Sequence, residues 1–289
     1  MELFLQQVLN GIMMGSTYAM VALGLTLMYG ILVVPQIAHG HVYMLGAYVA
    51  FTLIVFLNVN FWVALVISMV LLAGLGVVLE RLVFRNLKYE VKGSRIFPYI
   101  GALGLFFLLE HLANVIWGSA ARRIPNPNPE MVEFLGVAIS LQRLLVIIIA
   151  ALAIILLHLF IKKTIIGTAI DAAAQEPEGA SLVGINVNMT ASLTFAIAGA
   201  LAAVAAIMIG PIFMVDPQMG AIIIMKCMVV VILGGLGSIK GAIIAAYILG
   251  LIEALGGGYI STAYRDVFAF GILILILTIK PTGLFGREV

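Results

Sequence analysis

Charged side chains are scarce in this sequence of 289 residues. There are 15 Lys and Arg and 13 Asp and Glu, which together make up 10% of the chain, against roughly 25% in soluble domains. Hydrophobic residues reach 64%, and the mean hydropathy is +1.23. A soluble fold of this size cannot hide so much apolar surface. The composition therefore excludes a soluble enzyme, a disordered chain and a nucleic-acid-binding protein, and it predicts a polytopic membrane protein.

Cysteine is almost absent as well. Cys227 is the only one, and it lies in the apolar run AIIIMKCMVVVIL. A single cysteine excludes a disulfide framework and a cluster of thiolate ligands around a metal. The N-terminal segment MELFLQQVLNG carries Glu2 where a signal peptide would have basic residues. We therefore expect this segment to be the start of a retained helix.

Long apolar runs dominate what is present. A membrane-spanning helix needs about 20 mostly apolar residues. Runs of this kind lie at about 5–33, 42–57, 61–83, 98–117, 141–161, 190–213, 219–234, 241–255 and 266–280. They are much longer than the alternating segments of about ten residues in a membrane barrel. The sequence predicts an all-α bundle of about nine crossings in one domain, 1–289, with eight crossings as the alternative if 219–234 does not span.

Basic residues predict the orientation of these crossings. The longest polar segments are 84–97, 118–140 and 162–189. Placing 84–97 and 162–189 in the cytoplasm puts most Lys and Arg on the cytoplasmic side, as the positive-inside rule requires. That side then holds Arg81, Arg85, Lys88, Lys92, Arg95, Lys162, Lys163, Lys240, Lys280 and Arg287, and the other side holds Arg122, Arg123, Arg143 and Arg265. The N-terminus is expected outside and the C-terminus in the cytoplasm.

Three short segments rich in Gly or Pro interrupt the apolar pattern: 35–41, 210–217 and 234–241. Irregular backbone at membrane depth needs surrounding protein or a water-filled cavity, and interrupted segments in both halves of a transporter point to its substrate pathway. We therefore expect the first and third segments to face each other as part of an inner gate. The alternative for the third is a tight surface turn. The candidate residues of the translocation path here are Gln36, His39, Gly40, His41, Gly235, Gly237 and Ser238.

Ionisable residues inside the apolar runs are further candidates, because they are expensive in a bilayer and usually face the interior of a bundle. Lys226, Glu253 and the pair Glu110-His111 are such residues. Lys226 is therefore added to the translocation path. The alternative is a structural ion pair between helices, for example Lys226 with Glu253.

Catalytic and metal sites are not expected. His39 and His41 are two residues apart, which is too close for them to share a helix face, and no nearby Cys or carboxylate completes a metal site. Ser238 has no neighbouring base to activate it. No cofactor is predicted.

The central polar segment, 164–189, has its own pattern. Residues 169–174 strongly favour a helix. Pro177 suits the first turn of a second helix, Glu178 favours its N-terminus, and Gly184 suits its end. The sequence predicts a short helix from about Pro177 to Val183.

Several long motifs together resemble one protein family. They are LNGIMMGSTYAMVALGLTLMYGI with IAHGHVYMLGAYVAF, AAAQEPEGASLVGINV, and VILGGLGSIKGAIIAAYILGLIEAL with STAYRDVFAFGILILILTIKPTGLFG. In content and order they resemble the integral-membrane permease subunits of ABC importers for branched-chain amino acids. That group also includes importers of urea, amides and aromatic acids.

The resemblance implies a bacterial or archaeal inner-membrane protein that works in a complex. Its partners would be a second permease subunit, two cytoplasmic ABC ATPase subunits and an extracytoplasmic substrate-binding protein. A phosphate-binding P-loop requires a Gly-Lys pair, and this sequence has none, so another chain would bind ATP. Branched-chain amino acids are the default substrate, with amides, urea and small carboxylates as alternatives.

The resemblance also places the family's ATPase-coupling motif in the central segment. The coupling residues would be Glu176, Glu178, Gly179, Ala180, Leu182, Gly184 and Ile185. Ala180, Leu182 and Val183 would press into a groove on the ATPase. The chain departs from the family pattern at Asp171 and His41, where the family often has Arg and Glu. The alternative function is an ion-coupled secondary transporter, which would not need such a motif.

Overall fold

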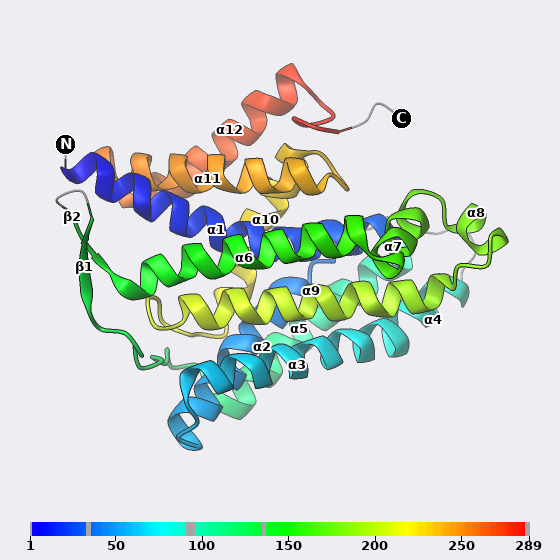
Figure 1. The fold of residues 1–289 in the computed structure, drawn as a ribbon, viewed down its shortest axis with the longest axis horizontal. Helices are drawn as coiled ribbons and strands as arrows, with labels where there is room; N and C mark the ends of the chain where they lie inside the picture. Colours follow the sequence, from blue (N-terminus) through cyan, green and yellow to red (C-terminus); the bar gives the residue numbers. More distant parts are fainter. Residues whose placement is uncertain (1, 33–35, 91–95, 135–136, 287–289) are drawn as a thin grey trace.

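The chain forms a bundle of long helices (Figure 1). The computed structural model describes residues 2–32, 36–90, 96–134 and 137–286. The long helices are α1 (Glu2–Leu32), α2 (His39–Phe51), α3 (Phe61–Leu79), α5 (Ile96–Trp117), α6 (Leu141–Lys163), α9 (Val187–Ile209), α10 (Met219–Gly234), α11 (Ile239–Tyr259) and α12 (Arg265–Ile279). The shorter elements are α4 (Arg85–Glu90), α7 (Ile165–Gln175), α8 (Pro177–Leu182), π-helical turns at Thr52–Phe56 and Glu80–Phe84, and a 3-10 turn at Thr262–Tyr264.

Each of the nine apolar runs coincides with one of the long helices, which confirms the predicted polytopic helical bundle of about nine crossings. Seven helical segments of the described chain are long and apolar enough to cross a membrane. The other two are shorter: α10 has 16 residues and α12 has 15. At 1.5 Å per residue these reach about 24 Å, less than the roughly 30 Å of a bilayer core. Their flanking segments must therefore lie partly within the membrane.

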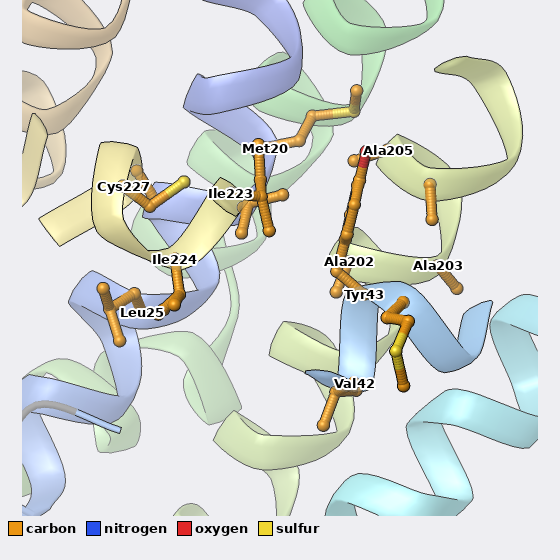
Figure 2. Close-up of a cluster of buried hydrophobic side chains, with 14 of the residues drawn as sticks. Met20, Leu25, Val42, Tyr43, Ala202, Ala203, Ala205, Ile223, Ile224 and Cys227 are labelled. Atoms are coloured by element: carbon orange, nitrogen blue, oxygen red, sulfur yellow. The ribbon is translucent and has the colours of Figure 1, made fainter. Parts of the chain in front are cut away.

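Helices α1 and α9 form the centre of the bundle, because most of each is buried, whereas only a minority of α5 and α6 is buried. Small residues let the central helices approach closely, as in other membrane bundles. A Cβ atom at Gly199 of α9 would lie 2.2 Å from the Leu72 carbonyl oxygen of α3. Figure 2 shows the core where α1, α2, α9 and α10 meet; its labelled side chains are Met20, Leu25, Val42, Tyr43, Ala202, Ala203, Ala205, Ile223, Ile224 and Cys227.

Helix α2 begins inside the bundle and not at its surface. A Cβ atom at Gly24 of α1 would lie 2.7 Å from His39 Nε2 and 3.2 Å from Ala198 Cα. Ala198 is the central residue of α9, so His39, the first residue of α2, lies at the middle of the bundle. The predicted break in this region is therefore at membrane depth. Pro35, which was part of the prediction, lies outside the described residues.

A two-stranded antiparallel hairpin, β1 (Met131–Phe134) with β2 (Val137–Ser140), was not predicted. Its register pairs Met131 with Ser140 and Phe134 with Val137. Strands had been excluded only for the apolar runs, and the hairpin lies in the polar segment 118–140. It leads directly into α6, because the Leu141 N–H donates a hydrogen bond to the Glu130 carbonyl, 2.9 Å away.

The two ends of the bundle carry different segments. Figure 1 shows the N-terminus and the hairpin at one end, and α4, α7, α8 and the C-terminus at the other. This is the relative arrangement that the basic residues predict, although Lys92, Arg95 and Arg287 lie outside the described residues. Which end faces the cytoplasm stays a prediction.

Thiol labelling in cells tests the orientation. Ser119 and Glu176 are exposed at opposite ends, and the native Cys227 is fully buried, so its background reaction is low. We expect Ser119→Cys to react with a membrane-impermeant maleimide in intact cells, and Glu176→Cys to react only after the cells are opened. The reverse pattern would invert the topology.

Candidate translocation site and coupling segment

A cavity of about 340 Å³ lies among α1, α2, α10 and α11, next to the segment between α9 and α10. Its lining combines charged and apolar side chains. The charged residues are Asp216, Lys226, Glu253 and Arg265. The volume is within the range of about 300–1,000 Å³ that is usual for small-molecule sites. Of the predicted path residues, Lys226 is the one that lines this cavity.

Lys226 forms an ion pair within the bundle. Its Nζ lies 2.5 Å from Glu253 Oε1 on α11 and 3.0 Å from Asp266 Oδ1 at the start of α12. The Tyr18 hydroxyl of α1 donates a hydrogen bond to the other oxygen of Glu253, 2.7 Å away. The predicted structural pair between Lys226 and Glu253 is therefore present, and it also lines the cavity. The two interpretations of Lys226 are compatible.

A second cavity of about 200 Å³ continues from the first toward the N-terminal end of α1. The two share Met14, Phe213, Glu253 and Arg265 as lining residues. Beyond these, the second cavity is lined by Gln7, Asn10 and Arg143. Arg143 of α6 donates a hydrogen bond to Asn10 Oδ1, 2.7 Å away. A line of polar groups therefore runs from this end of the bundle to Lys226.

The residues around His39 are packed in the protein and do not line either cavity. The Gln36 side chain accepts a hydrogen bond from the Ala38 N–H, 3.1 Å away. His39 is buried against α1, and His41 turns to α5, where its Nε2 lies 3.3 Å from Glu110 Oε2. Gly40 touches the start of α10, because a Cβ atom there would lie 2.1 Å from the Gly220 carbonyl oxygen. These contacts show that residues 36–41 pack against neighbouring helices.

The expected gate between His39-Gly40 and residues 234–241 is wrong. Gly40 contacts the start of α10, whereas Gly234 is the last residue of α10 and Gly235 follows it. From Gly220 to Gly234 an α-helix rises by about 20 Å. The two breaks therefore lie at opposite ends of α10.

The third break is instead a turn that joins α10 to α11. Gly235 and Gly237 have φ angles of 97° and 80°, which glycine adopts without strain. Ser238 caps α11 by accepting a hydrogen bond from the Gly241 N–H, 3.1 Å away. The turn packs on the C-terminal segment, whose Phe285 N–H bonds the Gly234 carbonyl at 3.1 Å.

The segment that is predicted to couple to an ATPase forms two short helices, α7 and α8, at the α4 end of the bundle (Figure 1). Helix α8 spans Pro177–Leu182 with Pro177 in its first turn, within one residue of the prediction. Gly184, with a φ of 87°, ends it, and the Ile185 N–H donates to the Ala180 carbonyl, 3.0 Å away. This is the glycine-dependent helix end that the sequence predicts.

Exposure separates the residues of α8 into two groups. Leu182 is 88% exposed and Val183 78%, although both are apolar. Ala180 is buried within the chain, so the expectation that it presses into a partner's groove is wrong. Between α7 and α8 lies an open groove of about 390 Å³, lined in part by Asp171, Glu176 and Gly179. The end of α8 is thus an exposed apolar tip beside an acidic groove.

Comparisons with known proteins identify the family of this chain. Residues 7–277 match the family described as "Branched-chain amino acid transport system / permease component". The chain belongs to this family. It is 37% identical to high-affinity branched-chain amino acid transport system permease proteins of Pseudomonas aeruginosa and Escherichia coli, over 98% of this chain and 96% of each relative. A probable branched-chain amino acid transport permease protein of Methanocaldococcus jannaschii is 30% identical over 98% of this chain and 93% of the relative.

One solved structure supports the fold of this permease family member. PsaBC from Streptococcus pneumoniae in complex with Fab matches with a TM-score of 0.51, covering 96% of this chain and 92% of that one at 17% identity. At this identity the likeness concerns the fold alone. The family and the apolar helices together establish a multi-pass membrane protein related to transport permeases.

Sequence reasoning missed several residues of the cavities in this permease. Asp216 was noted only as part of a break, and Arg265 only as a charge outside the membrane. Arg143 was likewise noted only as a charge outside the membrane, and Tyr18 gave no signal, since an isolated Tyr in an apolar helix is common. One sequence pattern could have indicated Asp216 and Arg265. Each stands at the start of one of the two shortest spans, next to Pro217 and Asp266 respectively.

Proposed function

We propose that this chain is the permease subunit of an ATP-driven ABC importer in the inner membrane of a bacterium or archaeon. It would form the translocation path with a second permease subunit, take energy from two cytoplasmic ATPase subunits, and receive substrate from an extracytoplasmic binding protein. The substrates would be branched-chain amino acids or similar small polar solutes, as the names of its relatives suggest.

The observation that carries this proposal is the apolar tip of α8. Leu182 and Val183 are exposed at the end of a short helix, outside the main bundle. Burying such side chains against a partner is favourable by about 1.5–3 kcal/mol each. Glu176 and Glu178 carry negative charge at the start of the same helix, whereas Asp171 is paired with Lys162 at 3.1 Å, so the receiving ATPase surface should be neutral or basic. The coupling residues remain those predicted, with Ala180 holding α8 in place from inside the chain.

An ion-coupled secondary transporter is the second candidate, and the membrane-embedded carboxylate of Glu253 favours it. Such a carboxylate can bind the coupling ion. Here, however, Glu253 is paired with Lys226 and accepts a hydrogen bond from Tyr18, so its charge is already balanced. That function would also leave the tip of α8 unexplained.

Co-purification separates the two candidates. The permease should be expressed in its native host and isolated through a tag on this chain alone. We expect an ABC ATPase subunit to elute with it in wild type and with Leu182→Met, which keeps an apolar tip. Isolation of this chain without any ATPase, while the membranes still take up amino acid along an ion gradient, would contradict the proposal.

A further inference from the structure

Two charged residues that line the cavity around Lys226 lack an ionic partner among the described residues. Among the residues that the structure describes, neither Asp216 nor Arg265 takes part in an ion pair. Their neighbours Lys226 and Glu253 are paired with each other. The cavity therefore presents one carboxylate, of the half-buried Asp216, and one guanidinium, of the exposed Arg265, and neither is neutralised by an ion pair among the described residues.

The positions of these two groups are fixed by their own segments. Asp216 Oδ1 accepts a hydrogen bond from the Gln218 N–H, 2.8 Å away, which holds the carboxylate in the turn before α10. The Arg265 side chain lies along α11, because a Cβ atom at Gly257 would be 2.5 Å from Arg265 Nε. Gly257 is one helical turn from Glu253. Arg265 is thus held beside the paired charges.

Most of the remaining lining of this cavity is apolar, apart from Thr17, Tyr18 and Tyr43. Met14 of α1, Phe213 from the preceding segment, and Met219 and Ile223 of α10 contribute to its lining. Methionine side chains adapt to ligands of different shape. The cavity therefore combines two opposite charges with a deformable apolar wall. This is the complement of a small molecule that has a carboxylate, an ammonium group and an aliphatic side chain.

We propose that this cavity is a binding site for a zwitterionic α-amino acid within the permease itself. Arg265 binds the carboxylate, for which its planar guanidinium is suited, and Asp216 binds the ammonium group. The Lys226–Glu253 pair, fixed by Tyr18, holds the helices around the site and is a positioning element. The ligand class rests on the proposed transport of amino acids. The site adds selection by the permease to any selection by a binding protein.

A thermal-shift measurement on the full chain tests the site. Because Asp216 and Arg265 both belong to this chain, the purified permease in lipid nanodiscs is used, without ATPase or binding protein. Cys227 is buried and is the only cysteine, so a fluorogenic maleimide reports the unfolding of the chain. L-leucine at about ten times its dissociation constant should raise the unfolding temperature by about 2–4 °C. Leucinamide, which lacks the carboxylate, and 4-methylpentanoate, which lacks the ammonium group, should each give less than half of this shift.

Substitutions of Arg265 and Asp216 test the ligand-binding role proposed for each. Arg265→Gln and Asp216→Asn should each abolish the L-leucine shift. Asn keeps the oxygen that accepts from Gln218, so the turn should remain. Arg123→Gln is the matched control, because Arg123 is exposed and lines neither cavity, and it should respond like wild type.

The proposal is overturned if wild type shows no shift, if the three probes act equally, or if Arg265→Gln keeps the full response. None of these results bears on ATP coupling, which the co-purification experiment decides. Equally, a permease that binds L-leucine in this way but never joins an ATPase would refute the proposed importer and leave the site standing.

Discussion

Replacing Gly40 with Leu is expected to remove nearly all folded permease from the membrane. A Cβ atom at this position would lie 2.1 Å from the Gly220 carbonyl oxygen and 2.7 Å from Ile224 Cβ. Both neighbours belong to α10, so the added atoms can be accommodated only if α2 and α10 separate. Overpacking of a core costs typically 1–3 kcal/mol, and a clash with backbone should reach or exceed about 3 kcal/mol. That is about a hundredfold in the ratio of folded to unfolded protein.

The measurement is the amount of monodisperse permease after detergent extraction, by fluorescence-detected gel filtration. Gly74→Leu is the matched control, because Gly74 lies in α3 and no atom of another helix is within 4 Å of where its Cβ would be. It should be produced like wild type. If Gly40→Leu gave normal amounts of folded protein and lost only uptake, the segment would serve as a gate after all and the packing account would be wrong.

Replacing Leu182 with Asp should abolish ATP-driven uptake and leave the permease folded. The side chain is 88% exposed in the isolated chain, so the substitution creates no buried charge there. In the complex the same carboxylate would enter an apolar interface without a partner, which is strongly unfavourable. We expect uptake to fall at least about tenfold, since a loss of 1.4 kcal/mol or more in binding corresponds to that factor.

Three quantities should be measured together: the folded permease, the ATPase retained by it, and the uptake. Leu182→Met keeps the apolar tip and should stay within about twofold of wild type, as hydrophobic swaps of similar volume are tolerated. Normal uptake by the Asp variant, with the ATPase still bound, would show that α8 does not couple the two subunits.

The sequence predicted the helices well, because hydrophobic run length alone determines which segments can span a bilayer. The segment from Pro177 to Gly184 was also predictable, since a proline start and a glycine end act locally. The gate hypothesis was wrong for a physical reason. Glycine marks close backbone approach, but the sequence does not state which partner approaches, and for Gly40 the partner is Gly220.

The cavity was predictable only in part. Lys226 and Glu253 stood out because a charge within an apolar run is rare. Asp216 and Arg265 did not, because they sit at the ends of spans, where charges are common. Their shared cavity depends on how α10, α11 and α12 begin and cross, which is a property of the three-dimensional packing.

The most direct measurement of the central claim is uptake of radiolabelled L-leucine into proteoliposomes that contain the purified complex. The vesicles should hold ATP and carry no ion gradient, and the binding protein should be supplied outside. Uptake is predicted only when ATP, the binding protein and the wild-type permease are all present, and it should be lost with Leu182→Asp. Accumulation without ATP when a proton or sodium gradient is imposed would contradict the claim that this permease is the membrane subunit of an ATP-driven importer.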